Sequence, residues 1–231
     1  MIRRAWAGVS AVLAGLANWR FFKPAVFIAC AVPLLVVAYE LCQVLLWNQP
    51  DALGADPAKA LLHETGRDAL ALLFITLTIT PLRRLFRVNR LQIVRRMLGV
   101  WSFTYAVVHV SMYLVFDQLC YSWETCQIGD IGKDLVKRPF IIAGMVAFTG
   151  LTLLAITSTG GWVRRLKKNW QRLHRLAYVA AVAAIVHFVW IQKSDFSEPL
   201  KWSYWLAVLF GLRIYFTIQK RTATRRTAVS S

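Results

Sequence analysis

The sequence predicts an all-α membrane protein of six transmembrane helices with both termini on the cytoplasmic side. Three observations lead to this fold class. The chain has 231 residues, is 58% hydrophobic and has a mean hydropathy of +0.49, which is too apolar for an ordinary soluble domain. Six apolar stretches approach the roughly 20 residues that a spanning helix needs. Basic and acidic residues alternate between the two predicted sides of the membrane.

The net charge of +17 is explained by topology rather than by a nucleic-acid partner. With a cytoplasmic N-terminus, the inner segments hold 21 of the 28 Lys and Arg residues: 3, 4, 20, 23, 83, 84, 87, 90, 95, 96, 164, 165, 167, 168, 172, 175, 213, 220, 221, 225 and 226. All 11 acidic residues fall on or towards the other side. This positive-inside pattern accounts for the excess charge and implies contact with membrane lipid. Docking of an anionic cofactor or an acidic partner on the basic loops is the alternative.

The expected spans lie near 25–47, 61–82, 97–116, 140–158, 172–192 and 202–219. They leave too little sequence for a soluble domain, so residues 1–231 form a single integral membrane domain. Residues 220–231 are its basic cytoplasmic tail. No internal repeat is evident.

The first span contains Pro33, which predicts a kink, and Glu40, the only carboxylate well inside a span. Glu40 is either a proton or quinol site or an acid satisfied by its neighbours. The second span opens with the polar turn 63–67 and stops at Pro81-Leu82-Arg83-Arg84. The third span follows the basic pair 95–96, and the fourth follows Pro139. The fifth span follows the basic loop 164–168, and the sixth follows a short outer segment.

Cysteine spacing excludes one kind of haem site. No Cys-x-x-Cys-His sequence is present, so haem is not attached covalently as in c-type cytochromes. We interpret Cys30 and Cys42 as small apolar residues of the first span. Cys120 and Cys126 bracket an outer loop, where a disulfide and two free thiols are both compatible with the sequence.

His109 and His187 lie deep inside apolar stretches, where polar groups are costly and usually functional. The 12 residues from Met97 to His109 give about 18 Å of helical rise, and the 14 from Leu173 to His187 about 21 Å. Both imidazoles should therefore lie at similar depth in the outer half of the bilayer. The pattern favours two axial ligands of one haem over two unrelated histidines bonded to neighbouring helices.

His174 lies at the cytoplasmic start of the fifth span, 13 residues before His187, or about 3.6 turns of helix. The third span offers it no matching histidine, because the position 14 residues before His109 is Arg95. A second bis-histidine haem is therefore not supported. His174 is either a possible ligand or contact of a second haem, a flavin or a quinone, or an ordinary interfacial histidine.

His63 and Arg67 lie at the outer start of the second span. They are either near a haem edge or a quinone, with Arg67 paired to a propionate, or part of a polar turn exposed to water. No nucleophile–base triad, phosphate-binding glycine loop or paired-carboxylate site is apparent. We therefore expect neither a hydrolase nor an ATP-driven pump.

Several short segments occur in an order and spacing that resemble a known family. They are 53–57, 63–67, 78–82, Arg95-Arg96-Met97-Leu98-Gly99, His109, 137–140, 157–159, 170–174 with Tyr178, and His187. The chain resembles the MsrQ (YedZ) family of haem-binding membrane subunits over roughly 53–192. That family belongs to the ferric-reductase-like transmembrane group.

The resemblance implies a ferric-reductase-like helix bundle in the bacterial inner membrane that binds haem b, and FMN as the family's second cofactor. It also implies electrons from the quinone pool or a cytoplasmic flavin reductase, and a periplasmic molybdoenzyme partner, MsrP, which repairs methionine sulfoxide in proteins. His109 and His187 match the family's transmembrane histidines, and His174 matches a third. Arg95 stands where oxidase relatives carry a second ligand histidine.

These inferences converge on a non-catalytic electron-transfer subunit of an oxidoreductase. Two alternatives differ from it. One is a quinol-linked cytochrome b that serves a different periplasmic reductase. The other is a small proton-coupled transporter that uses Glu40 and the histidines as a relay.

Overall fold

The computed structural model describes residues 10–15, 19–47, 53–54, 56–117, 137–192 and 195–229, and within these ranges it contains helices and no strand. The elements are α2 (Phe22–Leu45), α3 (Pro57–Phe86), η2 (Asn89–Leu91), α4 (Gln92–Met112), the π-helical turn η3 (Tyr113–Asp117), α6 (Pro139–Ile156), α7 (Gly160–Leu166), α8 (Lys168–Leu173), α9 (Leu176–Ile191) and α10 (Ser197–Val229). The predicted all-α class is confirmed. Cys120 and Cys126 lie outside the described residues.

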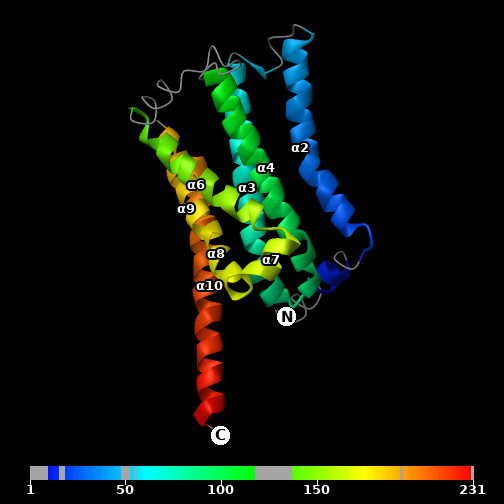
Figure 1. The fold of residues 1–231 in the computed structure, drawn as a ribbon, viewed down its shortest axis with the longest axis vertical. Coiled ribbons are helices and arrows are strands. Elements are labelled where there is room, and N and C mark those ends of the chain that lie inside the picture. Colours follow the sequence, from blue (N-terminus) through cyan, green and yellow to red (C-terminus); the bar gives the residue numbers. More distant parts are fainter. Residues whose placement is uncertain are drawn as a thin grey trace.

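Long helices run up and down the bundle in alternation, with α2 along one side (Figure 1). The most extensive packing joins α3 to α4 and α6 to α9. Contacts of α4 with α6, and of α3 with α9, bring these two pairs together. The bundle therefore consists of two antiparallel helix pairs, with α2 and α10 added at its edges.

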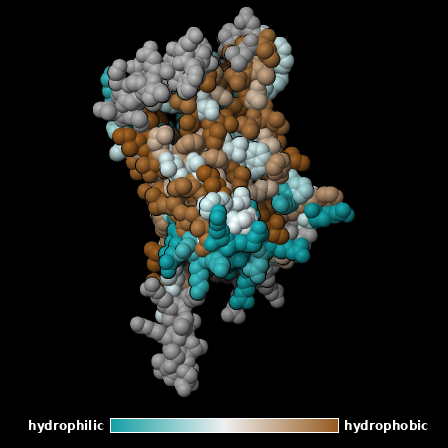
Figure 2. All heavy atoms as spheres, viewed as in Figure 1, coloured by the Kyte–Doolittle hydropathy of each residue, from teal (hydrophilic) through white to brown (hydrophobic). Residues whose placement is uncertain are grey.

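Five helical segments are long and apolar enough to cross a membrane: Phe22–Val44, Pro57–Phe86, Asn89–Phe116, Pro139–Ile156 and Lys168–Ile191. They make the chain a multi-pass membrane protein. An apolar surface covers most of the bundle, and hydrophilic residues gather at the end where α7 and α8 lie (Figure 2). The sixth expected span, 202–219, lies within α10, which is helical but is not among the five.

The boundaries of α3 differ from those predicted. Asp56 caps the helix by accepting a 3.0 Å hydrogen bond from the backbone N–H of Lys59, and Pro57 occupies the first turn. The helix then continues past Pro81 to Phe86 and ends at Arg87, whose φ of 59° is left-handed. The observed end lies two residues beyond the predicted stop at 81–84, and Pro81 is inside the helix, because a transmembrane helix tolerates proline where its neighbours satisfy the freed carbonyl.

The fifth predicted span, 172–192, is divided into α8 and α9, and His174 lies at the junction between them. The Trp170 and His174 rings pack against each other with their planes tilted by 30° and 3.9 Å between their centres. The indole N–H of Trp170 donates a 2.9 Å hydrogen bond to the carbonyl of Thr157. These contacts fix the turn that leads into α9.

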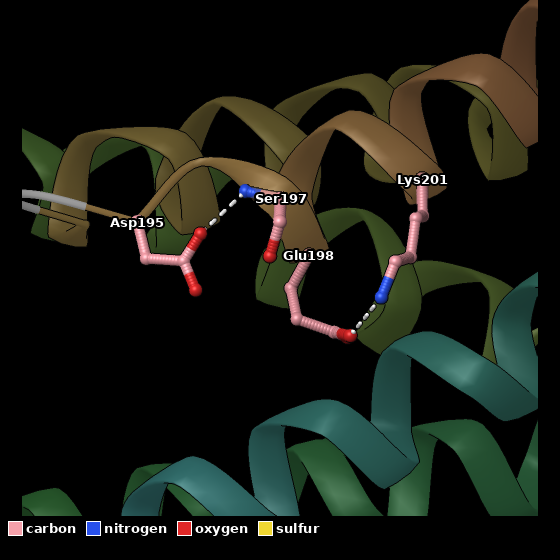
Figure 3. A network of polar contacts seen from close by, with 4 residues as sticks. All are labelled: Asp195, Ser197, Glu198 and Lys201. Carbon is pink, nitrogen blue, oxygen red and sulfur yellow. Dashed lines mark hydrogen bonds and ion pairs between the residues drawn. The ribbon is translucent and has the colours of Figure 1, made fainter.

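The start of α10 is held by short-range polar contacts (Figure 3). The Asp195 carboxylate accepts a 2.9 Å hydrogen bond from the backbone N–H of Ser197, which lowers the pKa of Asp195. One turn later Lys201 pairs with Glu198 at 2.8 Å. Further along, Phe74 of α3 packs edge-on against Trp202 and Trp205, so the apolar part of α10 closes the core of the bundle.

Candidate functional site

His109 projects from α4 towards α3. Its Nδ1 lies 2.9 Å from the carbonyl oxygen of Leu62 and 3.4 Å from the hydroxyl of Thr65. A carbonyl can only accept, so Nδ1 must carry the hydrogen. The same ring therefore presents Nε2 as a free lone pair, which is the form that binds a metal.

His187 projects from α9 towards α6 and repeats this arrangement. Its Nδ1 lies 2.7 Å from the carbonyl oxygen of Phe140, in the first turn of α6. The same reasoning places the hydrogen on Nδ1 and leaves Nε2 free. Both histidines are thus fixed by backbone atoms of the helix with which their own helix pairs.

The two imidazoles lie at the same level of the bundle, as the helical-rise arithmetic predicted. Their ring centres are 6.2 Å apart and their planes are nearly perpendicular, at 86°. A metal ion between two imidazoles, bonded at about 2 Å to each nitrogen, separates the ring centres by roughly 6 Å. The spacing therefore fits one metal centre shared by both rings.

A glycine makes room for each ring. A Cβ at Gly66 would lie 3.0 Å from both Nδ1 and Cε1 of His109. A Cβ at Gly144 would lie 2.9 Å from Nδ1 and 3.0 Å from Cε1 of His187. Any larger residue would push the ring out of place, so the glycines are part of the site.

The composition of the site fits haem better than a metal ion held by protein alone. Within the described residues there is no group of three or more His, Cys, Asp or Glu side chains that could hold a metal. A haem needs only two axial ligands from the protein, since its porphyrin supplies the other four. Paired imidazoles in an apolar bundle meet that requirement.

His174 lies away from this pair, at the α8–α9 junction. Its Nε2 is 3.4 Å from the hydroxyl of Thr157, and its ring packs against Trp170 at a tilt. Arg95 and Arg96 of α4 are its electrostatic neighbours, and neither offers an imidazole. The structure therefore brings no second histidine to His174 from α4.

His63 and Arg67 lie on the exposed side of α3, in its second and third turns. Together with Asp56, Lys59 and Glu64 they line an open hollow of about 520 Å³ at the end of the bundle where α3 begins. The His63 ring also contacts Phe188 edge-on, with 6.1 Å between ring centres. These two residues are not part of the His109–His187 pair.

Glu40 and the two described cysteines take no part in the pair. The Glu40 carboxyl is partly buried on α2, and its Oε2 has no hydrogen-bond partner within the described residues. Cys30 and Cys42 are free thiols on the same helix. The expectation that these cysteines serve as packing residues is compatible with this arrangement.

Sequence reasoning missed the residues that orient the histidines. Leu62, Gly66 and His109 have counterparts in Phe140, Gly144 and His187, each 78 residues further along the chain. Each histidine follows its carbonyl partner by 47 residues. The two halves therefore share the spacing of these three positions, although no repeat of similar residues marks it in the sequence.

Comparison with known proteins shows which family shares the sequence of this helix bundle. The family model described as "ferric reductase like transmembrane component" matches residues 65–185, which include His109, Gly66 and Gly144 and end two residues before His187. Three of the similar relatives illustrate the match, and each carries the name protein-methionine-sulfoxide reductase heme-binding subunit MsrQ. One from Xanthomonas campestris pv. campestris (strain B100) is 46% identical, covering 88% of this chain and 90% of its own.

The second relative, from Xanthomonas axonopodis pv. citri (strain 306), is 43% identical over the same shares of the two chains, 88% and 90%. The third, from Herminiimonas arsenicoxydans, is 41% identical over 90% of this chain and 91% of its own. The similarity thus extends over nearly the whole length of each protein. The chain therefore belongs to the ferric reductase like transmembrane family and, within it, to the MsrQ family.

Proposed function

We propose that this protein is the haem-binding membrane subunit of a methionine-sulfoxide reductase system, with a b-type haem held between His109 and His187. The observation that carries the proposal is the matched pair of rings, 6.2 Å apart, each with Nδ1 engaged by a backbone carbonyl and Nε2 free. The names of the MsrQ relatives support haem as the group that occupies this position.

When bound, the haem supplies reversible one-electron transfer. The chain supplies the conditions for it. Hydrogen bonds from His109 to Leu62 and from His187 to Phe140 fix the orientation of each ring and increase the basicity of its free nitrogen. Gly66 and Gly144 set the distance of the rings from their neighbouring helices. The surrounding apolar side chains keep water away.

Electrons pass outward in this proposal, to the periplasmic molybdoenzyme MsrP, which carries out the sulfoxide reduction. The donor is the quinone pool or a cytoplasmic flavin reductase, and FMN is the second cofactor. The protein lies in the bacterial inner membrane with α10 as its sixth span and both termini in the cytoplasm. The basic residues of α7 and α8, among them Arg164, Arg165 and Arg172, lie at the hydrophilic end seen in Figure 2 and support that orientation under the positive-inside rule.

The test is haem binding by the purified protein. We expect a low-spin b-type spectrum that is lost in both His109→Ala and His187→Ala, because each substitution removes one axial ligand. His63→Ala, which removes an exposed imidazole outside the pair, is the matched control and should retain the spectrum. Oxidised and dithionite-reduced absorption spectra with haem quantification provide the measurement.

Two outcomes would contradict the proposal. Wild-type haem content in either ligand variant would show that the rings are not the ligands. A colourless wild-type protein that stays colourless after haem supplementation would remove electron transfer altogether. Reoxidation of the reduced protein by purified MsrP, lost when the haem is lost, then tests the partner.

A further inference from the structure

A cluster of five arginines lies at the end of the bundle where α3 ends and α4 begins, away from the histidine pair. Arg83 and Arg84 belong to the last turn of α3, and Arg95 lies near the start of α4. Arg95 has Arg83 as an electrostatic neighbour. The electrostatic neighbours of Arg213, on α10, are Arg95, Arg84 and Arg175. Positive charges from α3, α4, α10 and the start of α9 therefore converge in this arginine cluster.

No acidic side chain lies near enough in sequence to neutralise the arginine cluster. On α3 the nearest acid, Asp68, precedes Arg83 by 15 residues, and on α10 Glu198 precedes Arg213 by 15 residues. Each interval corresponds to roughly 22 Å of helix. Three segments contain all five arginines and neither Asp nor Glu: 69–116, 135–194 and 199–231. These helices therefore provide positive charge without a countercharge.

Two hydrogen-bond donors on α3 lack acceptors beside this charge. Nε of Arg83 and Oγ1 of Thr80 are buried, and neither has a hydrogen-bond partner within the described residues. The two residues are three positions apart, so their side chains lie on one face of the helix. Buried donors without acceptors are costly. This face of α3 is therefore suited to a ligand that accepts hydrogen bonds and carries negative charge.

The arginine cluster lies at the level where two membrane-spanning segments end. Arg83 is three residues from the end of the span Pro57–Phe86, and Arg95 is six residues from the start of the span Asn89–Phe116. This is the end of the bundle with the hydrophilic surface in Figure 2. Lipid headgroups occupy the corresponding level of a bilayer, just outside its hydrocarbon core.

Aromatic rings hold the exposed members of the arginine cluster. The Arg213 guanidinium lies 4.2 Å from the centre of the Tyr178 ring, and that of Arg84 lies 5.7 Å from the centre of the Phe216 ring. A cation–π contact positions a charge but does not neutralise it. Both guanidinium groups thus keep their full charge for an anion bound beside Arg83.

We propose that the arginine cluster binds the phosphate group of an anionic phospholipid. Arg83 Nε and Thr80 Oγ1 donate hydrogen bonds to its phosphate oxygens, and its acyl chains lie against α3 and α10. The inference goes beyond the proposed function and does not depend on the haem.

A lipid fits the site better than two other sources of negative charge. Apolar side chains are exposed on α10 near Arg213, among them Val208 and Ile214, and they suit acyl chains but offer nothing to a soluble phosphate. A haem propionate would require an iron ligand nearby. His174 has Arg95 as an electrostatic neighbour, but α4 brings it no second histidine. Basic pockets between membrane helices are also a usual binding place for anionic headgroups.

The experiment is native mass spectrometry of the delipidated full chain in detergent, titrated with phosphatidylglycerol or phosphatidylcholine of the same acyl chains. We expect one phosphatidylglycerol to bind roughly tenfold more tightly than phosphatidylcholine, which has no net charge. Phosphatidylglycerol should also raise the unfolding temperature, followed by tryptophan fluorescence, because it binds the folded protein.

Two variants remove the two donors. Arg83→Met should weaken the binding of phosphatidylglycerol roughly tenfold, through loss of a hydrogen bond to a charged group, and Thr80→Val roughly fivefold. Without lipid, Arg83→Met should unfold at the wild-type temperature or above it, because it removes a charge that Arg95 repels. Arg90→Met removes an exposed charge of η2 at the same end of the bundle and is the matched control, which should bind the lipid as the wild type does.

Equal binding of the two lipids, or undiminished binding in Arg83→Met, would overturn the proposal. Displacement of phosphatidylglycerol by inorganic phosphate or FMN at equal concentration would overturn it in favour of a soluble phosphate. A second haem that is lost in Arg83→Met would overturn it in favour of propionates.

The haem spectrum of the same samples separates this result from the proposed function. Normal haem without selective lipid binding removes only the lipid site. Selective lipid binding by a protein that takes up no haem removes only the proposed function.

Discussion

The α3–α4 pair and the α6–α9 pair build the same half-site from different residues. In each, a histidine donates from Nδ1 to a carbonyl in an early turn of the neighbouring helix, and a glycine four residues after that carbonyl accommodates the ring. The residues around these three positions are largely different. The position of the ring thus depends on a backbone carbonyl and on the absence of a Cβ.

The pairs differ in how the helices are held together. Ser102 of α4 is fully buried and donates a 2.8 Å hydrogen bond to the carbonyl of Ala69 in α3. Its counterpart in α9 is Ala180, and a Cβ added at Gly150 of α6 would lie only 3.3 Å from the Ala180 Cβ. A polar bond in one pair is replaced by close packing of small residues in the other.

The largest effect is expected from variants of the glycines that accommodate the two imidazole rings, a feature that both helix pairs share. Gly66→Val and Gly144→Val would each press a side chain into the imidazole ring and displace Nε2 from the metal. We expect haem affinity to fall by roughly tenfold or more, the usual cost of disturbing groups that orient metal ligands. Haem titration of the apoprotein in detergent measures it.

Gly211→Val is the control for both glycine variants, because a Cβ at Gly211 in α10 meets no atom within 4 Å. It should leave haem affinity unchanged. Size-exclusion profiles of all three variants establish that each is folded. Wild-type affinity in Gly66→Val and Gly144→Val would show that the glycines do not position the rings.

A smaller effect is expected where α4 and α9 begin, because the two helix pairs carry different residues there. The residue 13 positions before His187 is His174, and the residue 13 positions before His109 is Arg96. Only one pair therefore supplies an imidazole there. We expect His174→Ala to retain the haem bound at the His109–His187 pair, in contrast to His187→Ala. Haem quantification of the two variants compares them directly, and complete loss in His174→Ala would contradict the asymmetry.

The sequence predicted the helices and the histidine pair for identifiable physical reasons. Apolar length marks a spanning helix, and an ionisable residue at depth stands out against it, as His109 and His187 do. The orienting contacts were not predictable in this way. The hydrogen-bond acceptors are main-chain carbonyls of Leu62 and Phe140, which carry no residue signature.

Other differences between the predicted and the observed structure have similar causes. The predicted stop at 81–84 lies two residues before the end of α3, because Pro81 usually stops a helix in water but not within a packed membrane bundle. The break at His174 depends on the hydrogen bond from Trp170 to Thr157, a contact between residues 13 apart that periodicity does not reveal.

The smallest effect is expected at the contact between Thr65 and His109, which has no counterpart at His187. Thr65 donates to the carbonyl of Leu61 at 2.7 Å, so its oxygen can accept weakly from His109 Nδ1 at 3.4 Å. The counterpart position is Ala143. Accepting from Nδ1 increases the electron density at Nε2 and favours ferric iron, so Thr65→Val should raise the haem midpoint potential. A shift of about 20 mV corresponds to a weak hydrogen bond of about 0.5 kcal/mol.

The reverse substitution, Ala143→Thr, should give His187 the same acceptor and lower the potential by a similar amount. Ser111→Ala, on the exposed side of α4 close to His109, controls for the loss of a hydroxyl and should leave the potential unchanged. Redox titration followed at the haem absorption band measures all three variants. Opposite shifts from Thr65→Val and Ala143→Thr would establish that the half-sites obey one rule; shifts of the same sign would show that the two histidines tune the iron in different ways.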